Sequence, residues 1–102
     1  MNPPRATTNV LQVYAVLLPN HERHYALGIS RQTNVNIGTI YAVLARLEQA
    51  ALVTSEIEAV TPALAGRPPR RYYTLTSEGR TVATRELDLA RKAIQSGGSA
   101  YA

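Results

Sequence analysis

The 102-residue sequence contains no cysteine, tryptophan or phenylalanine, and each absence narrows what the protein can be. Without cysteine there is no disulfide framework and no thiolate chemistry, which fits a reducing compartment. Without the two largest apolar rings, tyrosine and aliphatic side chains must fill the interior. We expect such a core to be shallow, and we expect a second copy of the chain to complete the fold.

Long apolar segments and catalytic clusters are missing too. No run approaches the roughly 20 residues that span a bilayer, and the first five residues lack the apolar centre of a signal peptide. Seven acidic residues and two histidines do not assemble a Ser/His/Asp set, a phosphate loop or a carboxylate pair. We therefore predict one cytoplasmic domain that is not an enzyme, uses no cofactor and has no membrane partner.

Basic residues outnumber acidic ones. Ten arginines and one lysine against seven acids give a net charge of +4 and a pI near 9.9. Arginine favours bidentate contacts with phosphate and guanine, although a preference for arginine can also reflect the codon usage of a GC-rich genome.

The most informative segment runs from residue 36 to 48. Its apolar residues share one helical face, namely Ile37, Ile40, Leu44, Leu47 and Ala51. The opposite face carries Gly38, Thr39, Ala42, Arg46 and Gln49. A solvated face normally mixes acidic and basic residues four apart, whereas small groups, a hydroxyl and an arginine suit close approach to a DNA groove. An ordinary amphipathic core helix is the alternative.

Two further helices are expected before this segment. The first starts at Thr7 or Thr8 and ends at Pro19, with Val10, Val13, Tyr14, Leu17 and Leu18 on one face. The second is predicted from Glu22 to about Gln32. A polar turn over residues 33–36 follows, with Asn36 as the N-cap of the next helix. Two helices joined by such a turn form a helix-turn-helix, whose second helix is the candidate to contact bases.

After Leu52 the apolar period changes to two. A strand is predicted over residues 53–59, with Val53, Ser55, Ile57 and Ala59 on its buried face. Residues 61–69 are predicted to be a loop, and residues 70–75 a returning strand. The hairpin carries Arg67, Arg70 and Arg71. A helix-turn-helix followed by a hairpin is a winged helix, and this wing would hold the densest positive charge in the chain.

A last helix is expected to start near Thr76 or Ser77. Ala83, Leu87, Ala90 and Ile94 follow the spacing of a seam between helices. The predicted fold class is therefore mainly α with a small β-hairpin, a winged helix-turn-helix plus a C-terminal dimerisation helix. Residues 1–6 form a flexible start, 7–76 the DNA-binding domain, 77–95 the dimerisation helix and 96–102 a flexible tail.

Two blocks of this sequence resemble PadR-type transcriptional regulators of the short-tailed branch. Residues 38–48, followed by Ala51-Leu52-Val53, are similar to the recognition helix, and residues 66–80 are similar to the wing and the next helix start. The resemblance covers roughly residues 10 to 95, with a few extra residues around 61–65. It implies a homodimeric bacterial regulator, usually a repressor, that binds a pseudo-palindromic DNA operator.

The resemblance also implies dimerisation through the C-terminal helix, with help from the first helix, and control by a small-molecule effector of unknown identity. The residues expected at the dimer contact are Val10, Tyr14, Ala83, Leu87, Ala90 and Ile94. Two departures from the family pattern limit which family properties can be expected of this chain. His24-Tyr25 stands where the family commonly has Gly-Tyr, and the absence of tryptophan excludes the ligand mode in which flat drugs lie between tryptophans.

The predicted DNA contacts come from the helices and the wing. They are Asn36, Gly38, Thr39, Tyr41, Arg46, Arg31, Arg67, Arg70 and Arg71. Tyr41 could instead pack in the core, and Arg46 could pair with a carboxylate, although the family match favours DNA contact for Tyr41. Arg71 could pair inward with Glu56 or Glu58. Arg67 and Arg70 are therefore the stronger wing candidates.

Two other functions remain open. The wing could dock an acidic protein instead of DNA. His21 and His24 have a spacing that can hold a metal, but no cysteine and no third histidine exist to complete the site, so we predict no metal.

Overall fold

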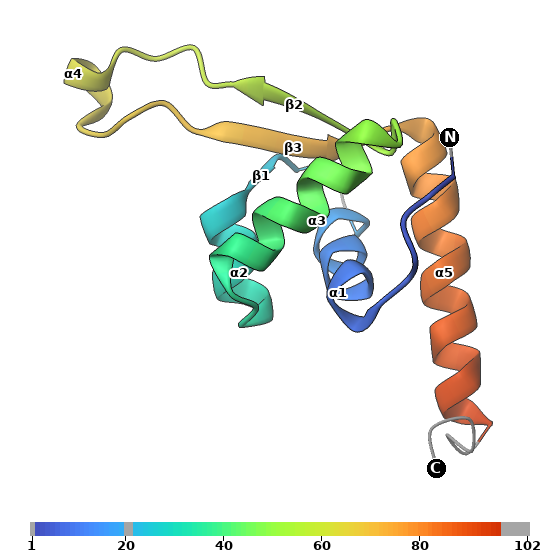
Figure 1. Cartoon of the computed structure of the whole chain (residues 1–102). Helices are drawn as coiled ribbons and strands as arrows, with labels where there is room; N and C mark the ends of the chain where they lie inside the picture. Colours follow the sequence, from blue (N-terminus) through green and yellow to red (C-terminus); the bar gives the residue numbers. More distant parts are fainter. Residues whose placement is uncertain (1, 20–21, 97–102) are drawn as a thin grey trace.

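The computed structural model describes residues 2–19 and 22–96, and it has the predicted winged-helix class (Figure 1). Its elements in chain order are α1 (Thr8–Leu17), β1 (His24–Tyr25), α2 (Ala26–Thr33), α3 (Ile37–Gln49), β2 (Val53–Ile57), α4 (Pro62–Ala65), β3 (Arg71–Leu75) and α5 (Ser77–Gln95). The three strands form one antiparallel sheet in the order β1-β3-β2. No helix in residues 2–19 and 22–96 is both long and apolar enough to cross a bilayer.

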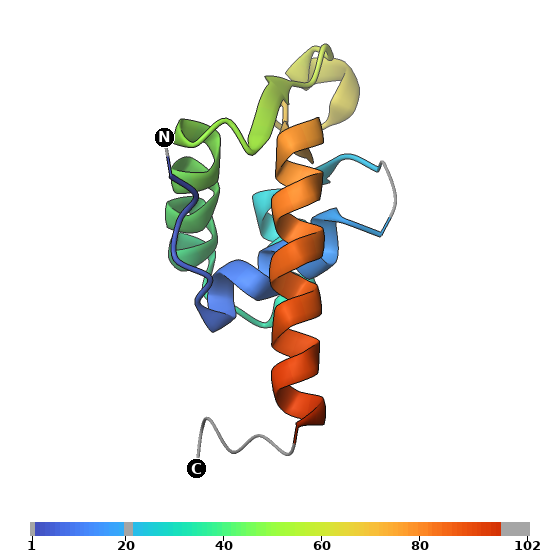
Figure 2. The ribbon, with the colours of Figure 1, turned by 90° about the vertical axis from the view of Figure 1, so that its right-hand side faces the viewer.

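The core lies between α1, α2 and α3, and α5 covers α1 from the other side (Figure 2). The buried side of α3 is formed by Ile40, Val43, Leu44 and Leu47, which confirms most of the predicted stripe and adds Val43. Tyr14 and Tyr73 are the two aromatic rings buried in the described core. No polar or charged residue of the described chain is buried there. Aliphatic packing with two tyrosines therefore replaces the missing phenylalanines.

Three helix starts agree with the sequence, because each has a side chain that caps it. Thr7 accepts a hydrogen bond from the Val10 amide at α1. Asn36 accepts one from the Gly38 amide at 2.8 Å, which fixes the start of α3. Thr76 accepts one from the Gly79 amide at 2.9 Å at α5. Such short-range caps can be recognised from sequence alone.

The predicted start of the second helix at Glu22 is wrong. The helix begins at Ala26, because His24 and Tyr25 pair with Tyr73 and Tyr72 of β3 as a third strand. A two-residue strand is too short to produce an alternating pattern, so no sequence signal announces it.

The predicted buried face of the first wing strand is also wrong beyond its start. Val53 is buried, but Ile57 is 57% exposed and Ala59 lies outside β2. Figure 1 shows the reason, since the outer parts of β2 and β3 extend past the helices and have no element to pack against. The predicted loop contains the short helix α4, with Pro62 at its first position. The return strand begins at Arg71 rather than Arg70.

The wing and α5 meet the end of α3 at one tight junction. The Thr76 amide donates to the Leu52 carbonyl at 2.9 Å, and the Thr76 hydroxyl donates to the Ala51 carbonyl at 2.8 Å. A Cβ added at Gly79 would lie 1.9 Å from the same Leu52 oxygen. Arg80 donates to the Leu18 carbonyl at 2.8 Å and so ties α5 to the end of α1.

We predict that Gly79→Ala lowers the free energy of unfolding by about 3 kcal/mol, because the new methyl group would overlap a fixed backbone carbonyl. Urea denaturation followed by circular dichroism measures it. Gly28→Ala is the matched control, since its Cβ would meet only the movable ring edge of Tyr25 at 3.2 Å. Equal stability of the two variants would contradict the prediction.

Candidate nucleic-acid interface

The exposed side of α3 has a ridge of small side chains. Gly38, Ala42 and Ala45 follow one another along it, opposite the buried stripe, and the longer Gln49 ends it. Thr39 and Arg46 flank the ridge on one side, and Tyr41 flanks it on the other. A helix with so low a ridge can approach a groove closely while the larger flanking groups contact its walls.

One hollow lies beside the ridge, between α3 and the chain segment that precedes and begins α1. It has a volume of about 550 Å³ and is lined by Thr7, Asn9, Asn36, Gly38, Thr39, Ala42, Val43 and Arg46. Four predicted DNA residues thus share one surface. Arg46 is exposed, and its guanidinium makes no ion pair within residues 2–19 and 22–96, so the carboxylate pairing considered for it is not found.

A second hollow, the wing groove, lies on the other side of α3. Its volume is about 700 Å³, and its walls come from α2, α3 and the wing. It brings together the other five predicted residues, Arg31, Tyr41, Arg67, Arg70 and Arg71, with Tyr25, Ala26, Leu27, Ile57, Pro68, Pro69 and Tyr73. Tyr41 is 54% exposed, so it does not pack in the core. The nine predicted residues therefore line two hollows on either side of one helix.

Glu58 holds the base of the wing tip together. Its carboxylate accepts hydrogen bonds from both terminal nitrogens of Arg67, at 2.6 and 3.2 Å. It also accepts from the Arg70 amide at 3.4 Å and the Tyr72 hydroxyl at 3.3 Å. The Arg67 guanidinium is the main reason that the pKa of Glu58 falls from 4.5 to about 2. Arg67 is thus paired, and the inward pairing considered for Arg71 belongs to Arg67 instead.

The remaining arginines of the groove are held without direct carboxylate pairing. The guanidinium carbon of Arg70 lies 4.2 Å from the ring centre of Tyr25. Arg71 donates to the Ser55 hydroxyl at 3.1 Å, and that hydroxyl donates to Glu48 at 2.8 Å. Arg31 is exposed at the end of α2. Cation–π stacking leaves a guanidinium its charge and its edge donors, so Arg70 can still contact an anion.

Comparison with known proteins agrees with this geometry. Residues 25–85 match the family described as the transcriptional regulator PadR-like family. The chain belongs to the PadR family. Among curated proteins, none matches it significantly in sequence. PadR-family regulators bind DNA and are not enzymes, so this chain is a DNA-binding transcriptional regulator of that family.

Solved structures share the fold. The PadR-like regulator BC4206 of Bacillus cereus strain ATCC 14579 aligns with a TM-score of 0.70 at 20% identity, over 89% of this chain and 90% of that one. A PadR-family regulator of Eggerthella lenta DSM 2243 aligns with a TM-score of 0.70 at 26% identity, over 90% and 79%. One from Clostridium difficile R20291 aligns with a TM-score of 0.64 at 23% identity, over 85% and 94%.

Sequence reasoning missed the aromatic contacts that hold this PadR wing against β1. The rings of Tyr25 and Tyr72 meet edge to face at 5.9 Å, and Arg23 lies 4.4 Å from the Tyr72 ring centre. Together with Arg70 on Tyr25, these side chains form a row in which two contacting rings lie between two guanidinium groups. Their signal was Tyr25, the half of the His24-Tyr25 pair that matches the family pattern, together with the two tyrosines of the return strand.

The predicted dimer residues fall into two groups. Val10, Tyr14 and Ala83 are buried in the chain's own core, so the structure does not leave them as a free surface. Leu87 and Ala90 are half-buried, and Leu87 packs partly on that core. Ile94 is 69% exposed, and Leu89, which was not predicted, is also exposed but points to another side of the helix. Among the predicted dimer residues, those with free surface therefore lie in the outer half of α5.

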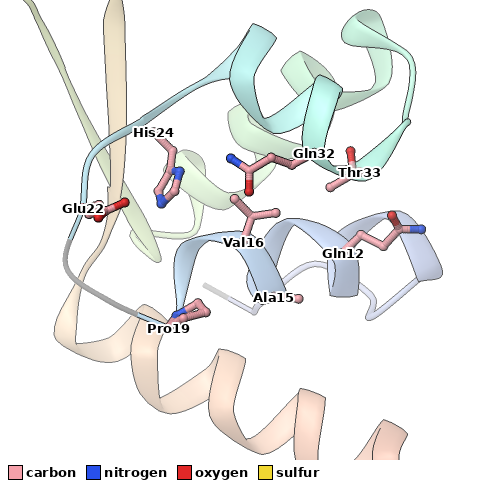
Figure 3. Close-up of a pocket in the computed structure, with 8 residues that line it drawn as sticks. All are labelled: Gln12, Ala15, Val16, Pro19, Glu22, His24, Gln32 and Thr33. Carbon is pink, nitrogen blue, oxygen red and sulfur yellow. The ribbon is translucent and has the colours of Figure 1, made fainter.

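A third hollow lies between α1 and α2 (Figure 3). It measures about 400 Å³ and is lined by Gln12, Ala15, Val16, Pro19, Glu22, His24, Gln32 and Thr33. Burial lowers the pKa of His24, whose Nε2 is buried and has no hydrogen-bond partner in the described chain. His21 lies outside the described residues, and no group of three metal-binding side chains occurs within them. His24 is therefore a half-buried side chain that packs beside α1 in the wall of this hollow.

We predict that Glu58→Gln loosens the wing, because the amide cannot neutralise Arg67. Hydrogen exchange measured by mass spectrometry should show lower protection over residues 58–71, with α1–α3 unchanged. In the unmodified chain the contact should persist below pH 4.5 and disappear only as pH falls through about 2, since folding lowers the pKa of this carboxyl.

Glu56→Gln is the control for this variant. Glu56 is exposed, and the one ion pair that it makes within the described residues, to Arg23, spans 4.0 Å. Loss of this ion pair should leave the hydrogen-exchange protection of the wing unchanged. If both variants behaved alike, Glu58 would have no special part in the wing.

Proposed function

We propose that the protein is a homodimeric repressor that binds a pseudo-palindromic operator, with α3 in the major groove of each half-site. The observation that carries this is the low ridge of α3 between two hollows that together hold all nine predicted DNA residues. Arg46 on one side, and Arg31 and Arg71 on the other, make no ion pair in the described chain. In the proposed complex they would contact the phosphates on both walls of the groove.

The start of α3 supplies the contacts nearest the bases. Asn36 caps the helix, so the free amides of the first turn face the DNA as a weak positive end. Gly38 lets the backbone approach, and Thr39 offers a hydroxyl for a base edge or phosphate and a methyl for thymine. Tyr41, exposed toward the wing groove, directs its hydroxyl to the opposite strand's backbone.

The second copy would pack against α5. Leu87, Ala90 and Ile94 keep the predicted spacing and lie on one side of α5. Two winged-helix units joined in this way place their α3 helices at half-sites about one helical turn, roughly 34–36 Å, apart, or a multiple of it. An effector that changes the angle between the units would control repression, and only through its different affinity for the two dimer states.

We predict that Arg46→Gln weakens DNA binding and lowers the slope of log affinity against log salt by about 0.9, the value for one phosphate contact. Mobility shift against the promoter of the gene itself, over a salt series, measures this. Arg91→Gln is the control, because Arg91 lies on α5 and pairs with Asp88. Absence of a shift, or binding that ignores salt, would end the proposal.

The same assay separates the alternative function, docking to an acidic protein. That function needs the wing arginines but not the α3 ridge. Thr39→Ala should then leave partner binding intact, whereas it should weaken operator binding if the hydroxyl contacts DNA.

We predict that Ile94→Glu weakens the dimer by at least roughly tenfold, because a charge would be placed in an apolar contact. Leu87→Glu should also give monomers, but Leu87 touches its own core, so Ile94 tests the interface more cleanly. Sedimentation equilibrium measures the change, with the exposed Gln95→Glu as control. An unchanged mass for Ile94→Glu would place the interface elsewhere.

A further inference from the structure

The far end of the wing is an uncharged, apolar surface. This wing tip comprises residues 59–66, with the sequence Ala-Val-Thr-Pro-Ala-Leu-Ala-Gly. All of its residues are exposed except Ala65, which is half-buried. Leu64 is 90% exposed, and α4, which carries it, lies at the end of the wing farthest from the helical core (Figure 1). An exposed apolar surface at the end of an extended arm commonly marks a contact site.

The wing tip is built to hold Leu64 outward. The Thr61 carbonyl accepts from the amides of Leu64 and Ala65, at 3.1 and 3.0 Å. Pro62 fits the first helical turn, and Gly66 ends the helix with a φ of +69°, a conformation that favours glycine. Glu58 and Arg67 close the base of the tip just behind it. The leucine therefore stands on an ordered, closed turn.

The charged residues that flank the wing tip in the sequence indicate what kind of partner it binds. Glu58 is neutralised by Arg67, and the next acidic residue along the chain is Glu78. Arg70 and Arg71, at the start of the return strand, make no ion pair in the described chain. An exposed apolar side chain with cations next to it suits a polyanion that has an apolar interior. A nucleic-acid duplex is such a partner, because its charged phosphates surround stacked bases.

The size of the tip argues against a protein partner. A stable protein interface needs roughly 800 Å² from each side, whereas the tip offers two large apolar side chains, Leu64 and Val60. A single leucine is, however, enough to enter a base step. Leucine and proline are among the residues that act as wedges between stacked bases in the minor groove.

We propose that the wing tip enters the minor groove beside each half-site and that Leu64 inserts between two base pairs, kinking the operator. This inference rests on the proposed DNA-binding function and adds a second means of sequence selection. Flexible pyrimidine–purine steps are the easiest to unstack, so the protein selects them at a position where it makes no base hydrogen bond.

The test uses a duplex enriched by the unmodified protein from a random-sequence library. A fluorescent adenine analogue is placed at successive positions across and beside the half-site, and donor and acceptor dyes at the two ends report bending. The unmodified protein and Leu64→Met should raise the fluorescence of the analogue at one step outside the α3 contact, and should shorten the end-to-end distance.

Leu64→Ala and Leu64→Asn should lose both signals and bind roughly tenfold more weakly, with an unchanged salt slope, because no phosphate contact is removed. Ala63→Ser, a neighbouring exposed change on the same turn, should behave like the unmodified protein. Retention of the unstacking signal in Leu64→Ala would overturn the proposal. So would a change of oligomeric state in Leu64→Ala without any change in base stacking.

Failure of DNA binding and failure of Leu64 insertion would give different results. If no sequence is enriched, or binding does not depend on salt, DNA binding itself is wrong and the wedge falls with it. If the unmodified protein binds with a full salt slope but leaves every base step stacked and the duplex straight, only the wedge is wrong.

Discussion

The structure depends on the junction where α3 ends and the wing and α5 begin. The Leu52 amide donates to the Leu47 carbonyl at 2.9 Å, and the Leu52 carbonyl accepts from the Thr76 amide. Leu52 therefore links the end of α3 to the start of α5. The turn is tight enough to force Ala51 to a φ of 61°, which costs a non-glycine residue about 1–2 kcal/mol, and to require glycine at position 79. This junction fixes the directions of α3, the wing and α5 relative to one another. A change in it would therefore move both the proposed DNA-binding surface and the proposed dimer surface.

The arginines of this basic chain have different tasks despite their shared charge. Arg80 donates a hydrogen bond to the Leu18 carbonyl, and Arg67 forms an ion pair with Glu58, so both side chains stabilise the fold. Arg46 and Arg31 stand free of ion pairs in the described chain, on opposite sides of α3. The density of positive charge along the sequence is therefore a poor guide to which arginines can contact phosphate. The partner of each guanidinium decides whether it can bind phosphate.

The sequence was sufficient wherever the deciding contact is local. The caps at Thr7, Asn36 and Thr76 and the stripe on α3 depend on residues within one or two turns, so the helix starts and the exposed ridge could be predicted. β1 depends on pairing with a strand almost fifty residues away, and Glu58–Arg67 depends on the fold of the wing tip. These could not be predicted, because neither contact leaves a periodic pattern in the sequence.

The outer half of α5 gives the physical reason to expect a partner. Figure 2 shows that its end runs beyond the other helices. Ile94 and Leu89 are exposed there, and local support comes from Asp88 with Lys92, an exposed pair of small value. An unsupported helix of two or three turns is marginal in water, because few backbone bonds offset the entropy of ordering it. Packing against a second copy would supply the missing apolar contact, and the same contact would then set the spacing of the two α3 helices on DNA.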